Sequence, residues 1–95
     1  MKKVAKRRAK IRKAQECLTQ AIGVMMEKGI IRFIPFAWCF GVVDMTVESD
    51  VFTDKEMVLT VREDDWNNGP AECVAQELAQ AMITGKVRFI PVKSE

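Results

Sequence analysis

The N-terminal segment concentrates the charge of this chain. Residues 1–13 hold eight cations and no acid, while residues 14–95 hold the other seven cations and all 13 acids. The segment therefore carries +8 and the remainder −6, although the net charge is only +2. Clustered cations neutralise the phosphates of DNA or RNA, which gives salt-dependent binding with little sequence preference. The candidate contact residues are Lys2, Lys3, Lys6, Arg7, Arg8, Lys10, Arg12 and Lys13.

Other roles for the basic segment stay open. It can be a solvated helix or tail, dock on an acidic partner protein, or fold onto the acidic loops of its own chain. An organelle transit peptide would also be rich in Arg and free of acids. Membrane binding is not expected, because the segment has no Trp, Phe or Leu to insert. The most apolar stretch, residues 30–43, is shorter than the roughly 20 residues of a membrane span.

A turn-rich connector at residues 63–70 is the second candidate contact. Trp66 lies there among acids and amides, and an exposed Trp is a common interface anchor. The alternative is that Trp66 folds back onto the core. The Gly69-Pro70 bond is a possible target for a prolyl isomerase, or it simply starts a helix. The candidate protein-binding residues are Trp66, Asp64, Asp65, Gly69 and Pro70, together with Phe52 in the acidic loop at 48–55.

Catalytic and metal-binding chemistry have little support in the sequence. The chain has no His and no Tyr, and it lacks the glycine motifs of nucleotide-binding enzymes. An odd set of thiols, Cys17, Cys39 and Cys73, indicates free cysteines in a reducing, cytoplasmic compartment. No base for a thiol nucleophile is evident, and no Cys-x-x-Cys pair suits zinc. We therefore expect no catalytic residue, no metal and no cofactor.

An internal repeat organises the elements that must position these residues. Residues 16–35 and 72–91 are identical at nine of twenty positions, at a constant offset of 56. Each copy reads as a helix, a glycine and a strand. Gly29 and Gly85 predict left-handed caps at the two helix ends. Cys17 and Cys73 hold matching helix positions, and we expect both to be small core residues.

The first half of the chain predicts a long helix and two strands. Residues 2–28 predict one helix, whose apolar stripe should face the core. At about 40 Å it would exceed the body, so its N-terminal turns should project. Residues 30–34 predict a strand that Pro35 either ends or places at a sheet edge. Residues 36–47 predict a second strand, with Gly41 as a possible bulge. The stripe consists of Ile11, Ala14, Leu18, Ala21, Ile22 and Met25.

The second half predicts a strand, a helix and a strand. Residues 56–61 alternate, with Met57, Leu59 and Val61 on one face. Pro70 predicts the start of the second helix, and residues 86–90 predict the last strand. The fold class is therefore α+β in the order α-β-β-β-α-β. It consists of a small antiparallel sheet with two helices on one face, and Arg32 and Arg88 on the other. We expect one domain, 14–95, with a basic helical extension, 1–13.

In its general layout the chain resembles small accessory proteins of bacteriophages. The shared features are a short chain with a basic end and an acidic body, and the loop proline of Gly69-Pro70. Within that class it is similar to the lambdoid-phage proteins that modify the host RecBCD nuclease. The resemblance implies a non-enzymatic protein that docks on this nucleic-acid-processing enzyme and modulates it, with possible recruitment of a host prolyl isomerase. The alternatives are direct DNA or RNA binding through the basic helix, and a structural homodimer.

Overall fold

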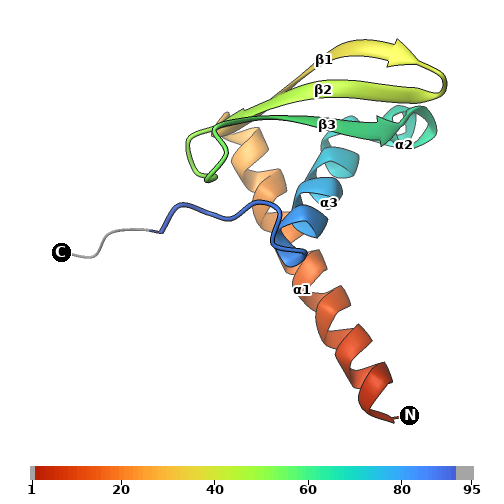
Figure 1. Ribbon diagram of the computed structural model, residues 1–95, viewed down its shortest axis with the longest axis vertical. Helices are drawn as coiled ribbons and strands as arrows, with labels where there is room; N and C mark the ends of the chain where they lie inside the picture. Colours follow the sequence, from red (N-terminus) through yellow and green to blue (C-terminus); the bar gives the residue numbers. More distant parts are fainter. Residues whose placement is uncertain (1, 92–95) are drawn as a thin grey trace.

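The protein is a small α+β domain with one long helix. The computed structural model describes the backbone of residues 2–91 and the side chains of residues 8–91. Helices α1 and α3 lie on the same side of a three-stranded antiparallel sheet of order β1-β2-β3 (Figure 1). This arrangement confirms the predicted fold class. The elements are α1 (Lys2–Glu27), β1 (Ile31–Cys39), β2 (Val42–Ser49), β3 (Glu56–Arg62), α2 (Glu63–Asn68) and α3 (Pro70–Ile83).

Helix α1 ends in the glycine cap that the sequence predicts. Gly29 has a φ of 76°, and its N–H donates to the carbonyl of Met26 over 3.1 Å. The N–H of Ile30 donates to the carbonyl of Met25 over 2.9 Å. These two bonds form a Schellman motif, which satisfies carbonyls that the helix end leaves free. The cap turns the chain out of α1 and directly into β1.

Helix α3 ends in the same way, 56 residues later. Gly85 has a φ of 79°, and its N–H donates to Met82 over 3.1 Å. The N–H of Lys86 donates to the carbonyl of Ala81 over 2.8 Å. The repeat in the sequence therefore encodes two helices with matching caps. At the other end of α3, Pro70 occupies the first turn, as predicted.

The two copies differ after their caps, and the predicted strand at 86–90 is wrong. This segment makes a single β-bridge, between Phe89 and Phe52. Flanking hydrogen bonds run from Thr53 N–H to the carbonyl of Arg88 and from Ile90 N–H to the carbonyl of Val51, each 2.8 Å long. Because its partner is a short stretch of loop, no strand can develop. Arg88 is exposed, but it does not lie on the sheet.

The prediction of one strand over residues 36–47 is also wrong. Phe40 and Gly41 both have positive φ, 55° and 77°, and Cys39 pairs with Val42. Positive φ at two consecutive loop residues is typical of the type I′ hairpin turn. Gly41 therefore reverses the chain between β1 and β2 and does not form a bulge. The register shift lies instead beside Pro35, which is on an edge strand as predicted.

The core lies between the inner face of the sheet and the two long helices. The strand pattern is confirmed: β2 alternates strictly, and Met57, Leu59 and Val61 face inward on β3. Burying each large apolar side chain contributes about 1.5–3 kcal/mol. The buried apolar residues are Ile22, Ile31, Val43, Met45, Val47, Phe52, Val61, Cys73, Val74, Ala75, Leu78, Ala79 and Val87.

The apolar stripe of α1 is buried only in its C-terminal half. Ile22 is fully buried and Leu18 packs against the core, but Ile11 is 46% exposed. Cys17 is exposed, so its predicted core position is wrong, whereas Cys73 is buried as predicted. Ile11 lies on the N-terminal part of α1, which extends beyond α3 and has nothing to pack on (Figure 1). Cys17 lies farther along, where α1 runs beside α3, and is on the exposed side of the helix.

Candidate functional site

The projecting part of α1 is the candidate binding arm. Arg8, Lys10, Arg12 and Lys13 are all exposed, and none forms an ion pair with a described residue. Arg8 and Arg12 are four residues apart and share one side of the helix, while Lys10 and Lys13 share another. The arm therefore carries cations on two sides. The side chains of Lys2, Lys3, Lys6 and Arg7 lie outside the described residues.

The N-terminal end of the arm extends away from the acidic loops of its own chain, whereas Arg12 borders a hollow with Glu16 and Glu72. In Figure 1 the N-terminal end of α1 points away from the sheet, α2 and the loop after β2. The first acid along the helix is Glu16. The arm therefore does not fold onto the acidic loops of its own chain in this structure. The four described cations are exposed and are available to an external polyanion.

Trp66 lies on the core, the second of the two positions considered for it. It is half-buried on α2 and packs against the core cluster. Its ring meets Phe33 edge-on, with centroids 5.8 Å apart, and Trp38 edge-on at 6.5 Å. Trp66 therefore joins the connector to β1. Most of its ring is engaged within the chain and is not free for a partner.

Phe52 is not a surface contact, and its predicted role in binding is wrong. It is fully buried and stacks on Phe89, with centroids 5.1 Å apart and planes at 10°. The loop around it is rich in acids. However, the antiparallel bridge between residues 51–53 and 88–90 draws the ring inward. The two phenylalanines together close the core beneath the loop.

The remaining connector residues are accessible but ordered. The predicted turn at 63–68 is the short helix α2, with Asp64 and Asp65 in its first turn. Carboxylates at a helix N-terminus are favourable there, which explains why this acidic stretch is helical. Asp64 is exposed, with a 4.0 Å ion pair to Arg62. The Gly69-Pro70 bond is trans and links α2 to α3.

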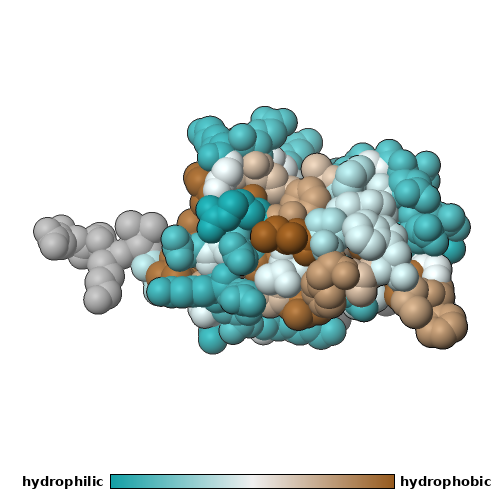
Figure 2. Space-filling view, turned by 90° about the horizontal axis from the view of Figure 1, so that it is seen from above, coloured by the Kyte–Doolittle hydropathy of each residue, from teal (hydrophilic) through white to brown (hydrophobic). Residues whose placement is uncertain are grey.

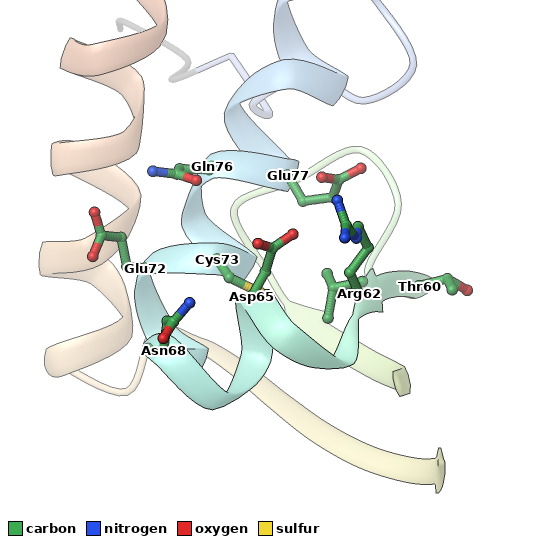
Figure 3. A pocket seen from close by; sticks show the side chains of 10 residues that line it. Thr60, Arg62, Asp65, Asn68, Glu72, Cys73, Gln76 and Glu77 are labelled. Atoms are coloured by element: carbon green, nitrogen blue, oxygen red, sulfur yellow. The ribbon is translucent and has the colours of Figure 1, made fainter. Parts of the chain in front are cut away.

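An acidic pocket lies beside α2 and α3. Its volume is about 440 Å³, and Asp65, Glu77 and Arg62 border it around the thiol of Cys73 (Figure 3). Burial raises the pKa of Cys73, and the charges of Asp65 and Glu77 raise it further. The thiol is therefore protonated at neutral pH, and a protonated thiol is a poor nucleophile. The pocket offers Cys73 neither a histidine nor an activating cation cluster.

The tip of the β1-β2 hairpin is a feature that the sequence reading missed. Phe40 is 99% exposed, and Trp38 is 55% exposed. Phe40 also holds a positive φ of 55°, a conformation that costs an ordinary residue about 1–2 kcal/mol. The available signal was the Phe-Gly pair between two apolar runs, because glycine at the second turn position favours a type I′ hairpin.

The described residues carry few other recognisable sites. Within residues 8–91, no three acids, cysteines or histidines come together as metal ligands. No helix over the described part of the chain is long and apolar enough to cross a membrane. A comparison with protein-family models, with curated proteins and with solved structures found no match to this chain.

Proposed function

We propose that the protein is a non-enzymatic, cytoplasmic binding protein that uses the N-terminal arm of α1 to bind the phosphate backbone of nucleic acid. The observation that carries the proposal is the placement of Arg8, Lys10, Arg12 and Lys13 on a projecting, acid-free stretch of helix. A free-standing helix is about 10–12 Å across with its side chains, which matches the width of the DNA major groove.

The distribution of cations favours a groove over a flat acidic surface. Arg8 and Arg12 lie on one side of the arm, and Lys10 and Lys13 lie on another. A helix inside a groove meets phosphates on both sides, whereas a helix on a flat surface meets a partner on one side only. The proposal therefore predicts duplex binding with strong salt dependence and little sequence preference.

Fluorescence anisotropy with a labelled 20-base-pair duplex tests the proposal. We expect the combined variant R8Q/K10Q/R12Q/K13Q to bind at least 10-fold more weakly at low salt. Each phosphate contact that is lost reduces the number of counterions that binding releases from the duplex. The slope of log K against log salt should flatten by up to about 0.9 per lost contact. Since the four side chains are exposed, the fold should be unaffected.

A matched control removes cations elsewhere on the surface. Lys86 and Arg88 are also exposed, but they follow α3 and are not part of the helix that forms the arm. The variant K86Q/R88Q should bind the duplex within about 2-fold of the parent. Equal losses for both variants would mean that net charge, and not the arm, drives binding. No binding of duplex, single strand or RNA at low salt would refute the proposal.

Docking on a host nuclease is the second candidate function, and the hairpin tip favours it. Phe40 is a fully exposed aromatic residue with an unfavourable backbone conformation, and such residues cluster at binding sites. The probe is purified RecBCD, the enzyme that the phage resemblance suggests. Addition of the protein should change its nuclease activity, and Phe40→Ala should reduce the effect. Unchanged nuclease activity at micromolar protein would exclude this partner.

A further inference from the structure

The two edges of the sheet differ in how they are protected from pairing with another strand. The outer face between them mixes apolar and hydrophilic side chains (Figure 2), which is ordinary for a solvated antiparallel sheet. Strand β1 forms one edge and β3 the other. Pro35 and a register shift lie on β1, and a proline or a bulge on an edge strand hinders further pairing. Strand β3 contains neither, so it is the edge that can accept another strand.

The strand register shows which backbone groups of β3 face its free edge. At one end of the ladder between β2 and β3, the N–H of Ser49 donates to the carbonyl of Lys55 over 2.9 Å. Hydrogen-bonded and non-hydrogen-bonded pairs alternate along an antiparallel ladder. Val58 and Thr60 therefore direct their N–H and C=O groups away from β2. Both residues are exposed, and no described backbone group outside the sheet bonds to them.

The acidic pocket lies against this free edge. Its lining includes three consecutive residues of β3, Thr60, Val61 and Arg62. Successive side chains of a strand point to opposite faces, so a cavity that touches three residues in a row lies at the edge of the strand. Helices α2 and α3 form the opposite wall (Figure 3). A strand added to β3 at the usual spacing of about 4.8 Å would direct alternate side chains into the pocket.

The charges around the pocket favour a cationic side chain. Asp65 and Glu77 direct carboxylates into it, whereas Glu72 points toward α1 (Figure 3). Arg62 is the one cation among the described lining residues, and its ion pair, at 4.0 Å, is with Asp64. One guanidinium is therefore shared by three carboxylates, those of Asp64, Asp65 and Glu77. The site keeps a net negative charge.

The pocket also contains a thiol without a partner. Cys73 is only 9% exposed, and its side chain lies in the pocket wall beside Asp65 (Figure 3). Its sulfur makes no hydrogen bond to any residue in the range 8–91. A thiol packs like a small apolar group, so this wall can accept the methylene stem of a long cationic side chain. The stem would then end at the carboxylates.

We propose that the free edge of β3 and the acidic pocket together bind an extended segment of a partner protein that carries a lysine or an arginine. The segment adds a fourth strand, antiparallel to β3, and bonds to the backbone of Thr60. Its basic side chain lies opposite Val61, passes Cys73 and meets the carboxylates of Asp65 and Glu77. In such strand addition, main-chain hydrogen bonds supply affinity and side-chain pockets supply specificity.

Nuclear magnetic resonance titration of the full, isotope-labelled chain tests the site. The probe is the end-blocked peptide Thr-Val-Thr-Lys-Thr-Val-Thr, whose β-branched residues favour an extended chain. We expect a Kd below about 1 mM, with shifts in the amide signals of residues 58–62 and 73–77. A matched peptide with glutamine in place of lysine should bind about 5-fold more weakly, because it forms no ion pair in the pocket.

Variants of the protein test the pocket. D65N/E77Q should weaken binding of the lysine peptide about 5-fold and leave the glutamine peptide unaffected, because it removes only charge from two exposed side chains. The control D54N/E56Q removes the same charge from exposed acids outside the pocket and should bind like the parent. Equal losses for the two variants, or equal binding of the two peptides, would overturn the proposal.

A modified peptide tests the sheet edge. N-methylation of the two threonines beside the lysine removes N–H groups that pair with β3 in an antiparallel strand. This peptide should therefore lose most of its affinity although its charge is unchanged. Undiminished binding, or the absence of any amide shift at about 1 mM of the original peptide, would also overturn the proposal.

The site is independent of the proposed binding of nucleic acid. Its residues lie on β3, α2 and α3, and the arm lies on α1. The variant R8Q/K10Q/R12Q/K13Q should therefore bind the lysine peptide like the parent, even where it no longer binds the duplex. Tighter peptide binding by this variant would mean that the arm of a second copy occupies the site. That result would overturn the assignment to a partner protein and leave the nucleic-acid proposal standing.

Discussion

Trp66 meets Phe33 edge-on, with ring centroids 5.8 Å apart and planes at 89°. This contact joins α2, the short helix after the sheet, to the edge strand β1. Edge-to-face aromatic pairs contribute about 0.5–1.5 kcal/mol beyond the area they bury. Trp38 extends the cluster toward the hairpin tip, at 6.5 Å from Trp66. The aromatic cluster therefore holds the connector against the strand that leads into the turn with the exposed Phe40.

Trp66→Ala should lower the free energy of unfolding by roughly 2–4 kcal/mol, because a half-buried Trp loses both its packing and its aromatic partners. Trp66→Phe should cost less, since a smaller ring can still meet Phe33. Urea denaturation measures both values, and near-ultraviolet circular dichroism should lose the signal of the Trp38 and Trp66 pair. An unchanged unfolding midpoint for Trp66→Ala would show that the ring is not part of the core.

The sequence predicts this fold well wherever a local rule operates. Gly29 and Gly85 were predicted as left-handed caps, and both have positive φ. Residues 56–61 alternate in sequence and in burial, because one side of β3 faces the helices. Pro70 starts α3 for a local reason too, since its missing N–H is not needed in the first turn of a helix.

The sequence failed where a distant partner decides the outcome. Phe52 is buried because residues 88–90 pair with its loop, and no local sequence pattern predicts that bridge. Apolar residues also recur at every second position through Phe36, Trp38 and Phe40, as in a continuous strand. The hairpin turn at Phe40 could therefore not be recognised from this alternation. The basic arm was predicted to project, and it does. What the arm binds depends on an external partner, and the sequence of this chain does not encode that partner.

The glycines of this chain should respond to alanine in opposite directions. Gly29→Ala and Gly85→Ala should each lower stability by about 1–2 kcal/mol, because alanine strains at positive φ. The space around both positions is open, so conformation alone sets the cost. Gly23 lies inside α1 with nothing within 4 Å of an added Cβ. Gly23→Ala should therefore stabilise by about 0.5–1 kcal/mol.

Thermal unfolding distinguishes these changes. For a domain of this size, 1 kcal/mol corresponds to a shift in Tm of about 4–8 °C. The two cap variants should shift downward by similar amounts, because they replace equivalent positions of the repeat. An upward shift in Tm for Gly29→Ala would show that the helix end at Gly29 is not a left-handed cap in solution.

The three cysteines should divide into two reactive thiols and one slow thiol. Cys17 and Cys39 are exposed, whereas Cys73 is buried and has a raised pKa. A disulfide reagent at pH 7.5 should modify two thiols at least 10-fold faster than the third, because the thiolate is the reacting form. Cys73→Ala should remove the slow phase alone. Three equal rates would mean that the pocket around Cys73 opens freely.

The raised pKa of Cys73 also makes stability depend on pH in the alkaline range. The folded state keeps the thiol proton to a higher pH than the unfolded state, whose thiol has a pKa of about 8.5. This contribution is therefore complete below about pH 8.5, and it is lost as the pH rises through the folded pKa. Urea denaturation from pH 7.5 to 10 should show a steeper decline for the parent than for Cys73→Ala. Parallel curves would contradict the assignment.

Phe40 offers a case where stability and binding should move in opposite directions. Its side chain is 99% exposed and its φ is 55°, so the fold gains little from the ring and the backbone is strained. Asparagine tolerates this conformation and is favoured in type I′ turns. Phe40→Asn should therefore raise stability by roughly 0.5–1 kcal/mol, and the β-branched control Phe40→Val should lower it.

The same Phe40→Asn protein should lose any effect on the nuclease that depends on the hairpin tip. Binding energy at interfaces is concentrated in a few anchors, and aromatic side chains are prominent among them. Urea denaturation and nuclease activity, measured on one preparation, give the two results together. A gain in stability with loss of the nuclease effect would identify Phe40 as a contact residue whose conformation costs the fold. A gain in stability with the nuclease effect intact would instead remove the tip from the interface.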